Sequence, residues 1–295
     1  MGRFSHNILV MLKFSPRIMS FAGRLLKMAS LLAAVFLAAV PYSRLLLSSP
    51  AVRLESPAQV SSREKGSTKS AAKDLPVPFR SGEVLKYQVS WMAFPDAASV
   101  QLRVVDRLEL RGMQVWHFAA EAHSVNPLRQ LFAIDDRFDS YAEAATLASR
   151  QFETHLSELG RAQDQVLILQ PKGSPSRNPA PVVIVEPGTR DPLSVIYWLR
   201  AIDWQNTPAP ATPLYDGHDV YEMRASLEAP FEQLSVMAGK FSASRIKLRV
   251  SQSGRVVKGI DFMVWLAADS VKTPLVIEAS IPLGTFRAEL TGTSR

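Results

Sequence analysis

Residues 113–124 read MQVWHFAAEAHS, and this stretch decides the fold class. In an extended strand successive side chains point to opposite faces, so the stretch has one apolar face and one polar face. The apolar face carries Trp116, Phe118, Ala120 and Ala122, and the polar face carries His117, Glu121 and His123. A strand of this length must cover its apolar face, either by packing on a second sheet or by curling around another element.

Similar strand-length runs fill the sequence from Phe79 onward, bounded by turn residues. Four junctions have hairpin chemistry: Arg111-Gly112, Leu159-Gly160, Ser253-Gly254 and Leu283-Gly284. We expect strands over 83–92, 98–110, 113–124, 131–141, 146–158, 164–170, 181–186, 219–227, 231–238, 240–251, 255–267, 273–281 and 284–291. The pattern predicts a mainly β protein, with one large curved antiparallel sheet, half-barrel or sandwich-like, in a single domain over residues 79–295.

One short helix is expected at residues 191–203, DPLSVIYWLRAID. Asp191 is a good N-cap and Pro192 suits the first helical position. The segment is apolar almost all round, which is typical of a buried helix. The Pro-rich stretches 171–181 and 205–213 are interpreted as long loops on either side. We also expect Arg200, on this helix, to form a buried structural ion pair.

These landmarks together resemble a known family. The segments FRSGEVLKYQVSW, FAIDDRFDSY, DPLSVIYWLR and AGKFSASRIKL, with the ending VWLAADSVKTPLVIEASIPLGTFRAEL, are similar in order and spacing to the bacterial exported family known as domain of unknown function 3108. The resemblance covers residues 79–291 and implies an envelope location and a mainly antiparallel β fold, with no established activity. A curved sheet around a buried helix is also similar to the half-barrel of periplasmic lipoprotein carriers, an analogy of fold alone.

The N-terminal segment, residues 1–47, is predicted to be a signal peptide or a signal anchor. Its apolar run at 28–43 follows a positively charged stretch and is nearer in length to a signal sequence than to a full span. Both cleavage and retention as an anchor remain open, and either places the rest of the chain outside the cytoplasm. Residues 48–78 are rich in Ser, Ala, Pro and Lys, and we interpret them as a disordered linker.

The charge of the chain belongs to this leader. The sequence has 34 Lys and Arg against 27 Asp and Glu, and all seven excess positive charges precede Glu55. The remaining chain is formally neutral, which argues against a nucleic-acid partner. The chain has no cysteine, so disulfides, thiolate metal sites and a cysteine nucleophile are excluded.

No motif for catalysis or cofactor binding is found, so no catalytic, metal or cofactor residues are predicted. His117 and His123 are about 20 Å apart along one strand, too far to share a metal. His155 and His218 are isolated in sequence and are interpreted as surface histidines. The cluster Asp135, Asp136 and Asp139 is expected to be structural, with solvent-facing strand carboxylates paired with Arg. Alternation puts Asp135 and Asp139 on one face and Asp136 on the other, and Arg137 neutralises part of the charge.

The leading hypothesis is a non-catalytic binding or carrier module of the cell envelope or periplasm. Its partner would be a hydrophobic small molecule or lipid, held between the sheet and the helix of residues 191–203. One alternative is a structural or interaction protein tethered to the inner membrane, which predicts a fully packed interior. The other is an envelope hydrolase, which needs convergent carboxylates or a Ser-His pair in a pocket.

Overall fold

The computed structural model describes residues 74–174 and 182–294. The predicted leader and nearly all of the predicted linker lie outside the described residues. Within the described part, no helix has the length and apolar character to cross a membrane. The elements are β1 (Val84–Trp91), β2 (Phe94–Leu110), β3 (Met113–Ser124), η2 (Leu128–Gln130), β4 (Asp135–Glu143), β5 (Ser149–Glu158), β6 (Arg161–Pro171), β7 (Val182–Val185), α3 (Pro192–Ala201), β8 (Ala211–Tyr215), β9 (Val220–Val236), β10 (Gly239–Gln252), β11 (Arg255–Val256), β12 (Asp261–Ala267), β13 (Pro274–Ile281) and β14 (Gly284–Ser294).

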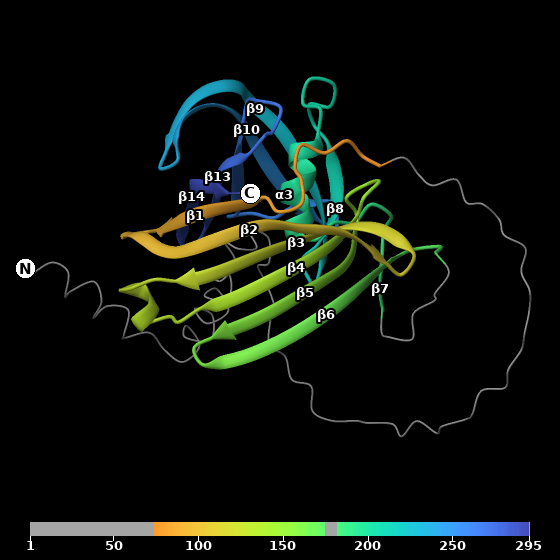
Figure 1. Ribbon diagram of the computed structural model, residues 1–295, viewed down its shortest axis with the longest axis horizontal. Helices are drawn as coiled ribbons and strands as arrows, with labels where there is room; N and C mark the ends of the chain where they lie inside the picture. The colour runs from red at the N-terminus through yellow and green to blue at the C-terminus, as the bar shows by residue number, and fades with distance from the viewer. Residues whose placement is uncertain (1–73, 175–181, 295) are drawn as a thin grey trace, which may run out of the picture.

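All the strands join one sheet, in the order β7-β6-β5-β4-β3-β2-β1-β14-β13-β12-β10-β9-β8, with β11 paired to β10. Neighbours are antiparallel except β6 and β7, which are parallel. The sheet curls until its two edge strands approach each other (Figure 1). The mainly β, curved and antiparallel prediction is therefore confirmed, and the sheet is nearly closed into a barrel.

A short segment links the start of β5 to the edge strand β8. The carbonyl of Thr189 accepts a hydrogen bond from the Ser149 N–H at the start of β5. The next residue, Arg190, exchanges backbone hydrogen bonds with β8, donating to Pro213 and accepting from Tyr215. Because backbone groups at a sheet edge need partners, this link satisfies part of the β8 edge and joins it to β5 across the gap in the barrel.

Helix α3 follows this link directly and lies inside the curve of the sheet, against β3 and β4 (Figure 1). Asp191 is its N-cap, with the side chain accepting from the N–H groups of Leu193 and Ser194 at 2.8 Å each. Pro192 occupies the first helical position, as expected. The apolar faces of the strands and the helix form one core, in which the side chains of Phe118, Ala120 and Ala122 are buried.

The antiparallel order gives the barrel two distinct ends. The connections β1–β2, β3–β4, β5–β6, β8–β9, β10–β12 and β13–β14 all lie at one end, named here the turn end. Three of them, β1–β2, β3–β4 and β5–β6, are seen on the left of Figure 1. The connections β2–β3, β4–β5, β9–β10 and β12–β13 lie at the other end. We name it the helix end, because Glu83, just before β1, contacts α3 there.

Beyond shifts of a few residues at strand ends, four expected segments differ from the structure. The runs 219–227 and 231–238 form one strand, β9, which passes Pro230 where the register with β10 shifts. Residues 211–215, expected in a loop, form the edge strand β8. The run 255–267 is divided into β11 and β12 by a turn, and the beginning of the run 131–141 precedes β4. Tertiary pairing overrides local turn signals in each case.

Candidate functional site

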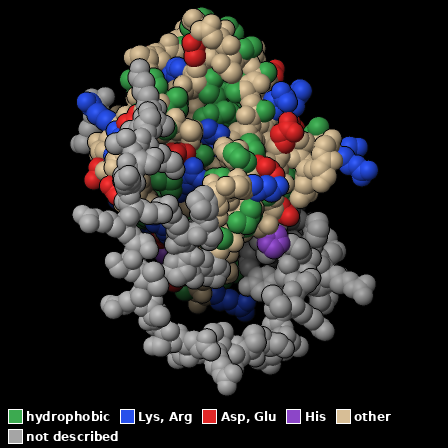
Figure 2. Space-filling view, turned by 90° about the vertical axis from the view of Figure 1, so that its right-hand side faces the viewer, with side chains coloured by type: hydrophobic (Ala, Val, Ile, Leu, Met, Phe, Trp, Pro, Cys, Tyr) green, Lys and Arg blue, Asp and Glu red, His purple; other side chains and the backbone are tan. Residues whose placement is uncertain are grey.

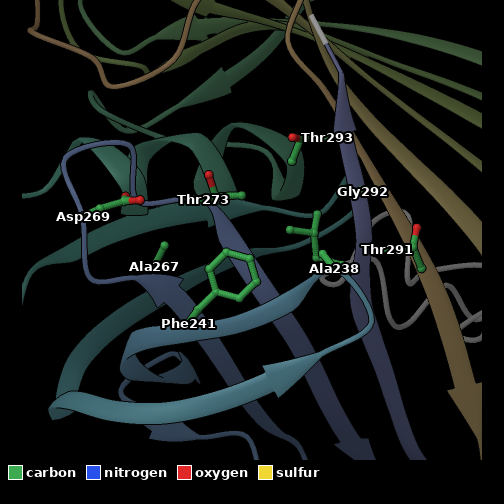
Figure 3. A pocket seen from close by; sticks show the side chains of 9 residues that line it. Ala238, Phe241, Ala267, Asp269, Thr273, Thr291, Gly292 and Thr293 are labelled. Atoms are coloured by element: carbon green, nitrogen blue, oxygen red, sulfur yellow. The ribbon is translucent and has the colours of Figure 1, made fainter.

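A pocket of about 260 Å³ lies at the helix end, beneath the β9–β10 turn (Figure 3). Its wall combines that turn, the β12–β13 connection and the last residues of β14. Its apolar part is formed by Ala238, Phe241, Ala267 and Leu290, and its polar part by Asp269, Thr273, Thr291, Gly292 and Thr293. The lining is thus about half apolar and half polar, so it can contact both parts of a small amphiphilic molecule.

The pocket exists because β14 is longer than its neighbour β13. The last pair between these strands is Val276 with Glu289, so from Leu290 onward β14 pairs only with β1. The β9–β10 turn bends over this free edge, and the Ala238 N–H donates to the Leu290 carbonyl at 2.9 Å. The turn thus roofs a space that a longer β13 would have filled.

Two threonines on β14 face opposite ways. Thr293 lies on the side of the strand that faces Thr273, whereas Thr291 points away (Figure 3). The Thr291 hydroxyl donates to the Lys86 carbonyl at 3.0 Å, outside the pocket. In the register of β1 with β14, Thr293 lies opposite Leu85, whose side chain is buried. Thr293 itself is exposed, so the interior of the barrel is open at this position.

The space between the sheet and α3 is filled by aromatic rings. The rings of Phe118 and Tyr197 are stacked with centroids 3.8 Å apart, and Phe79 meets both edge-on at 5.4 and 5.2 Å. All three side chains are buried. The expected position of a hydrophobic ligand, between the sheet and the helix, is thus occupied by protein side chains. The pocket at the helix end is a different position.

The beginning of α3 carries a buried polar network. The Asp191 carboxylate accepts from the hydroxyls of Ser140 and Ser149 at 2.5 Å each, and Ser149 and Ser194 are 2.8 Å apart. Burial raises the pKa of Asp191, and the hydrogen bonds from Ser140, Ser149 and the helix N–H groups act against this. No histidine contacts this set among the described residues. Serine and aspartate alone do not make a nucleophile–base pair, so the network is a helix cap.

The other end of α3 holds the ion pair expected of Arg200. Its guanidinium donates to both carboxylate oxygens of Glu83, at 2.5 and 2.9 Å, and to the Val271 carbonyl at 3.3 Å. Arg200 is fully buried. The pair ties the helix to the start of β1, which is a structural role.

The outer face of β3–β5 brings together residues that are far apart in sequence. His117 Nε2 lies 2.7 Å from Asp139, and Asp139, Glu153 and His155 have donor atoms within 4.8 Å of one another. Such a set could hold a metal ion, and sequence spacing did not reveal it. However, Arg137 donates to both oxygens of Asp139, at 2.7 and 3.0 Å, and thus already supplies a positive charge. We interpret the set as a cross-strand ion-pair network.

The acidic residues of β4 that the sequence analysis singled out lie on both faces of the strand. Asp135 and Asp139 lie on the outer face, and Asp135 pairs with Arg129 and His123. The expectation that these carboxylates face solvent is wrong for Asp136 and Asp139, which are both buried. One oxygen of Asp136 accepts from the Ser157 N–H at 2.9 Å. The other oxygen has no hydrogen-bond partner among the described residues. Burial raises the pKa of Asp136 to about 7.

Three solved structures are similar to this chain. A beta-barrel-like protein of the family DUF1849 from Brucella abortus aligns with a TM-score of 0.45 and 9% identity, over 72% of this chain and 96% of that chain. A candidate lipoprotein from Parabacteroides distasonis has a TM-score of 0.36 and 10% identity, over 75% and 100%. A candidate exported protein with a YmcC-like fold from Bacteroides fragilis has a TM-score of 0.32 and 10% identity, over 76% and 100%. Similarity at this level carries no argument about function.

Comparison with curated proteins finds no match. The family model described as "Protein of unknown function (DUF3108)" matches residues 86–291, which is more than two thirds of the chain and nearly the whole barrel. The match agrees with the sequence resemblance, and the chain belongs to the DUF3108 family.

Proposed function

We propose that this protein is a non-catalytic binding module of the cell envelope, and that it holds a hydrophobic or lipid-like group in the pocket at the helix end. The observation that carries the proposal is the pocket itself, with Phe241 and Leu290 on its apolar side and Thr273 and Thr293 on its polar side. This division matches an amphiphile whose chain enters the barrel and whose polar group stays at the threonines.

The size of the pocket limits the ligand. Small-molecule sites usually measure about 300 to 1,000 Å³. A volume of about 260 Å³ therefore suits one short acyl chain or the end of a longer one, rather than a whole phospholipid. This distinguishes the proposal from the wide cavity of a lipid carrier.

The experiment uses two threonines of β14. The full chain is delipidated and titrated with a short-chain fluorescent fatty acid, and lipid released from undelipidated protein is identified by mass spectrometry. Thr293→Phe places a ring in the pocket, and we expect it to abolish uptake of the probe. Thr285→Phe is the matched control, because Thr285 is exposed on the same strand and does not line the pocket, and we expect it to bind like the wild type. Equal uptake by both variants, or no lipid and no uptake in the wild type, would reject the proposal.

A second function is favoured by a separate observation. The interior around α3 is packed with rings, as the hypothesis of a structural or interaction protein requires. That function predicts no ligand in the pocket, so absence of probe uptake would favour it. A hydrolase has less support, because the pocket has a single carboxylate, Asp269, and this group already accepts the N–H groups of Val271 and Lys272.

A further inference from the structure

The turn end exposes large apolar side chains at nearly every connection. Ten large hydrophobic residues are exposed in the described part of the chain, and five of them lie at or beside connections of the turn end. Only one, Met237, lies at a connection of the helix end. The five, named here the apolar rim, are Met92, Leu131, Leu159, Val220 and Val256, with exposed fractions between 44% and 62%.

The strand topology places the members of the apolar rim at one end of the barrel, although they are spread over the sequence from Met92 to Val256. Met92 follows β1, Leu131 follows η2, and Leu159 follows β5. Val220 begins β9, and Val256 ends β11. The sixth connection at this end carries Leu283, which is half-buried. Each connection thus offers one apolar side chain in a ring around the barrel.

Two members of the rim are held in a backbone conformation that disfavours them. Met92 and Leu159 both have φ of 51°, in the left-handed region. Tight hairpin turns favour Asn, Asp or Gly at such positions, because other residues are strained there. A polar residue would be better for the turn and for solubility. The turns therefore do not account for the large apolar side chains at these two positions.

We propose that the apolar rim docks the turn end on the surface of a lipid bilayer. Its members project singly from separate turns, without forming a flat patch. Separate apolar tips suit a deformable partner such as the interface of a bilayer, whereas a protein partner usually needs a continuous complementary surface. Both cations (Arg161, Arg255 and Lys258) and carboxylates (Asp96 and Asp261) are exposed beside the rim connections, so the choice of a bilayer rests on the apolar side chains.

The predicted leader supports this choice of partner. An apolar segment at residues 28–43 in a membrane would keep the domain close to that bilayer at a high effective concentration. The chain enters β1 from the helix end, so the linker must pass the barrel for the turn end to face the lipid. Residues 48–78 can extend to about 100 Å, which is enough to do so. This inference is independent of the ligand in the pocket.

The absence of cysteine makes the test direct. Single cysteines are introduced at Leu159, Val256, Phe231 and Met237 in the full chain, labelled with an environment-sensitive fluorophore, and reconstituted in phosphatidylethanolamine–phosphatidylglycerol vesicles. Phe231 and Met237 are exposed apolar controls outside the rim. We expect a blue shift and loss of iodide quenching for the labels at Leu159 and Val256, and no change for the two controls.

A second variant shows whether the apolar side chains are responsible. With the label at Leu159→Cys, the change Val256→Asn together with Leu131→Asn should restore iodide quenching in the presence of vesicles. Thr293→Phe should leave the label protected, because it affects only the pocket. Labels at Leu159 and Val256 that stay as accessible to iodide as the label at Phe231 would overturn the proposal, as would protection that appears only when a protein partner is added.

Discussion

The two ends of the barrel treat polar and apolar groups in opposite ways. At the helix end Arg200 binds Glu83, Asp191 caps α3, and the buried Arg190 donates to Thr212 and to two backbone carbonyls. At the turn end the buried carboxyl of Asp136 has one oxygen without a partner, and large apolar residues are exposed. Figure 2 shows the face that lies on the right of Figure 1, and this face carries both basic and acidic side chains. We infer that the helix end provides stability, whereas the turn end keeps features that cost stability.

The largest effect is expected from Arg200→Met at the helix end. This change leaves the Glu83 carboxylate buried without its cation, which typically costs about 3 to 5 kcal/mol. The double variant Arg200→Met with Glu83→Gln should recover most of the loss, because it removes both charges. Chemical denaturation followed by tryptophan fluorescence measures both. A single variant within about 1 kcal/mol of the wild type would mean that the pair does not hold the helix end together.

Asp136 at the turn end should respond in the opposite direction. Its pKa in the folded protein is about 7, against an ordinary value of 3.8. The folded state therefore holds an extra proton between these values, so the free energy of unfolding decreases as pH rises through this window. Asp136→Asn keeps an oxygen for the Ser157 N–H and removes the charge. Near pH 8 it should be more stable than the wild type by about 2 to 4 kcal/mol.

The pH dependence provides the control for this prediction. Denaturation of both proteins at pH 5 and pH 8 should give a smaller difference at the lower pH, where Asp136 is protonated in the folded wild type. If Asp136→Asn leaves the slope of stability against pH unchanged, the carboxyl is solvated and the contrast between the two ends is weaker than we infer.

Local chemistry made much of the fold predictable. Asp191 and Pro192 are adjacent signals that identify the start of α3. Strand alternation separated Asp136 from Asp139, but it did not predict that both are buried. The pairing of strands could not be predicted from local chemistry in the same way. Pro230 resembles the end of a strand, but β10 pairs on both sides of it.

The candidate sites were less accessible to sequence reasoning, because their residues meet only through topology. The pocket joins the β9–β10 turn to β14, and the set of Asp139, Glu153 and His155 joins two strands. The Leu159-Gly160 turn was recognised as a hairpin, but its neighbours in the apolar rim depend on the strand order. The sequence did contain one indication of the apolar rim, because an apolar residue before Gly at a hairpin turn is unusual.

The smallest expected effect separates strain from function at the two ends. Leu159 at the turn end and Arg111 at the helix end both have φ of 51° and both precede Gly in a hairpin turn. Because Asn tolerates this conformation, Leu159→Asn and Arg111→Asn should each raise the free energy of unfolding, by about 1 kcal/mol. Only Leu159→Asn should also weaken the protection of a label at Val256 by vesicles. A gain in stability at Leu159 with loss of lipid contact would indicate that the strained leucine is retained for binding, whereas equal behaviour of the two variants towards vesicles would assign it no such role.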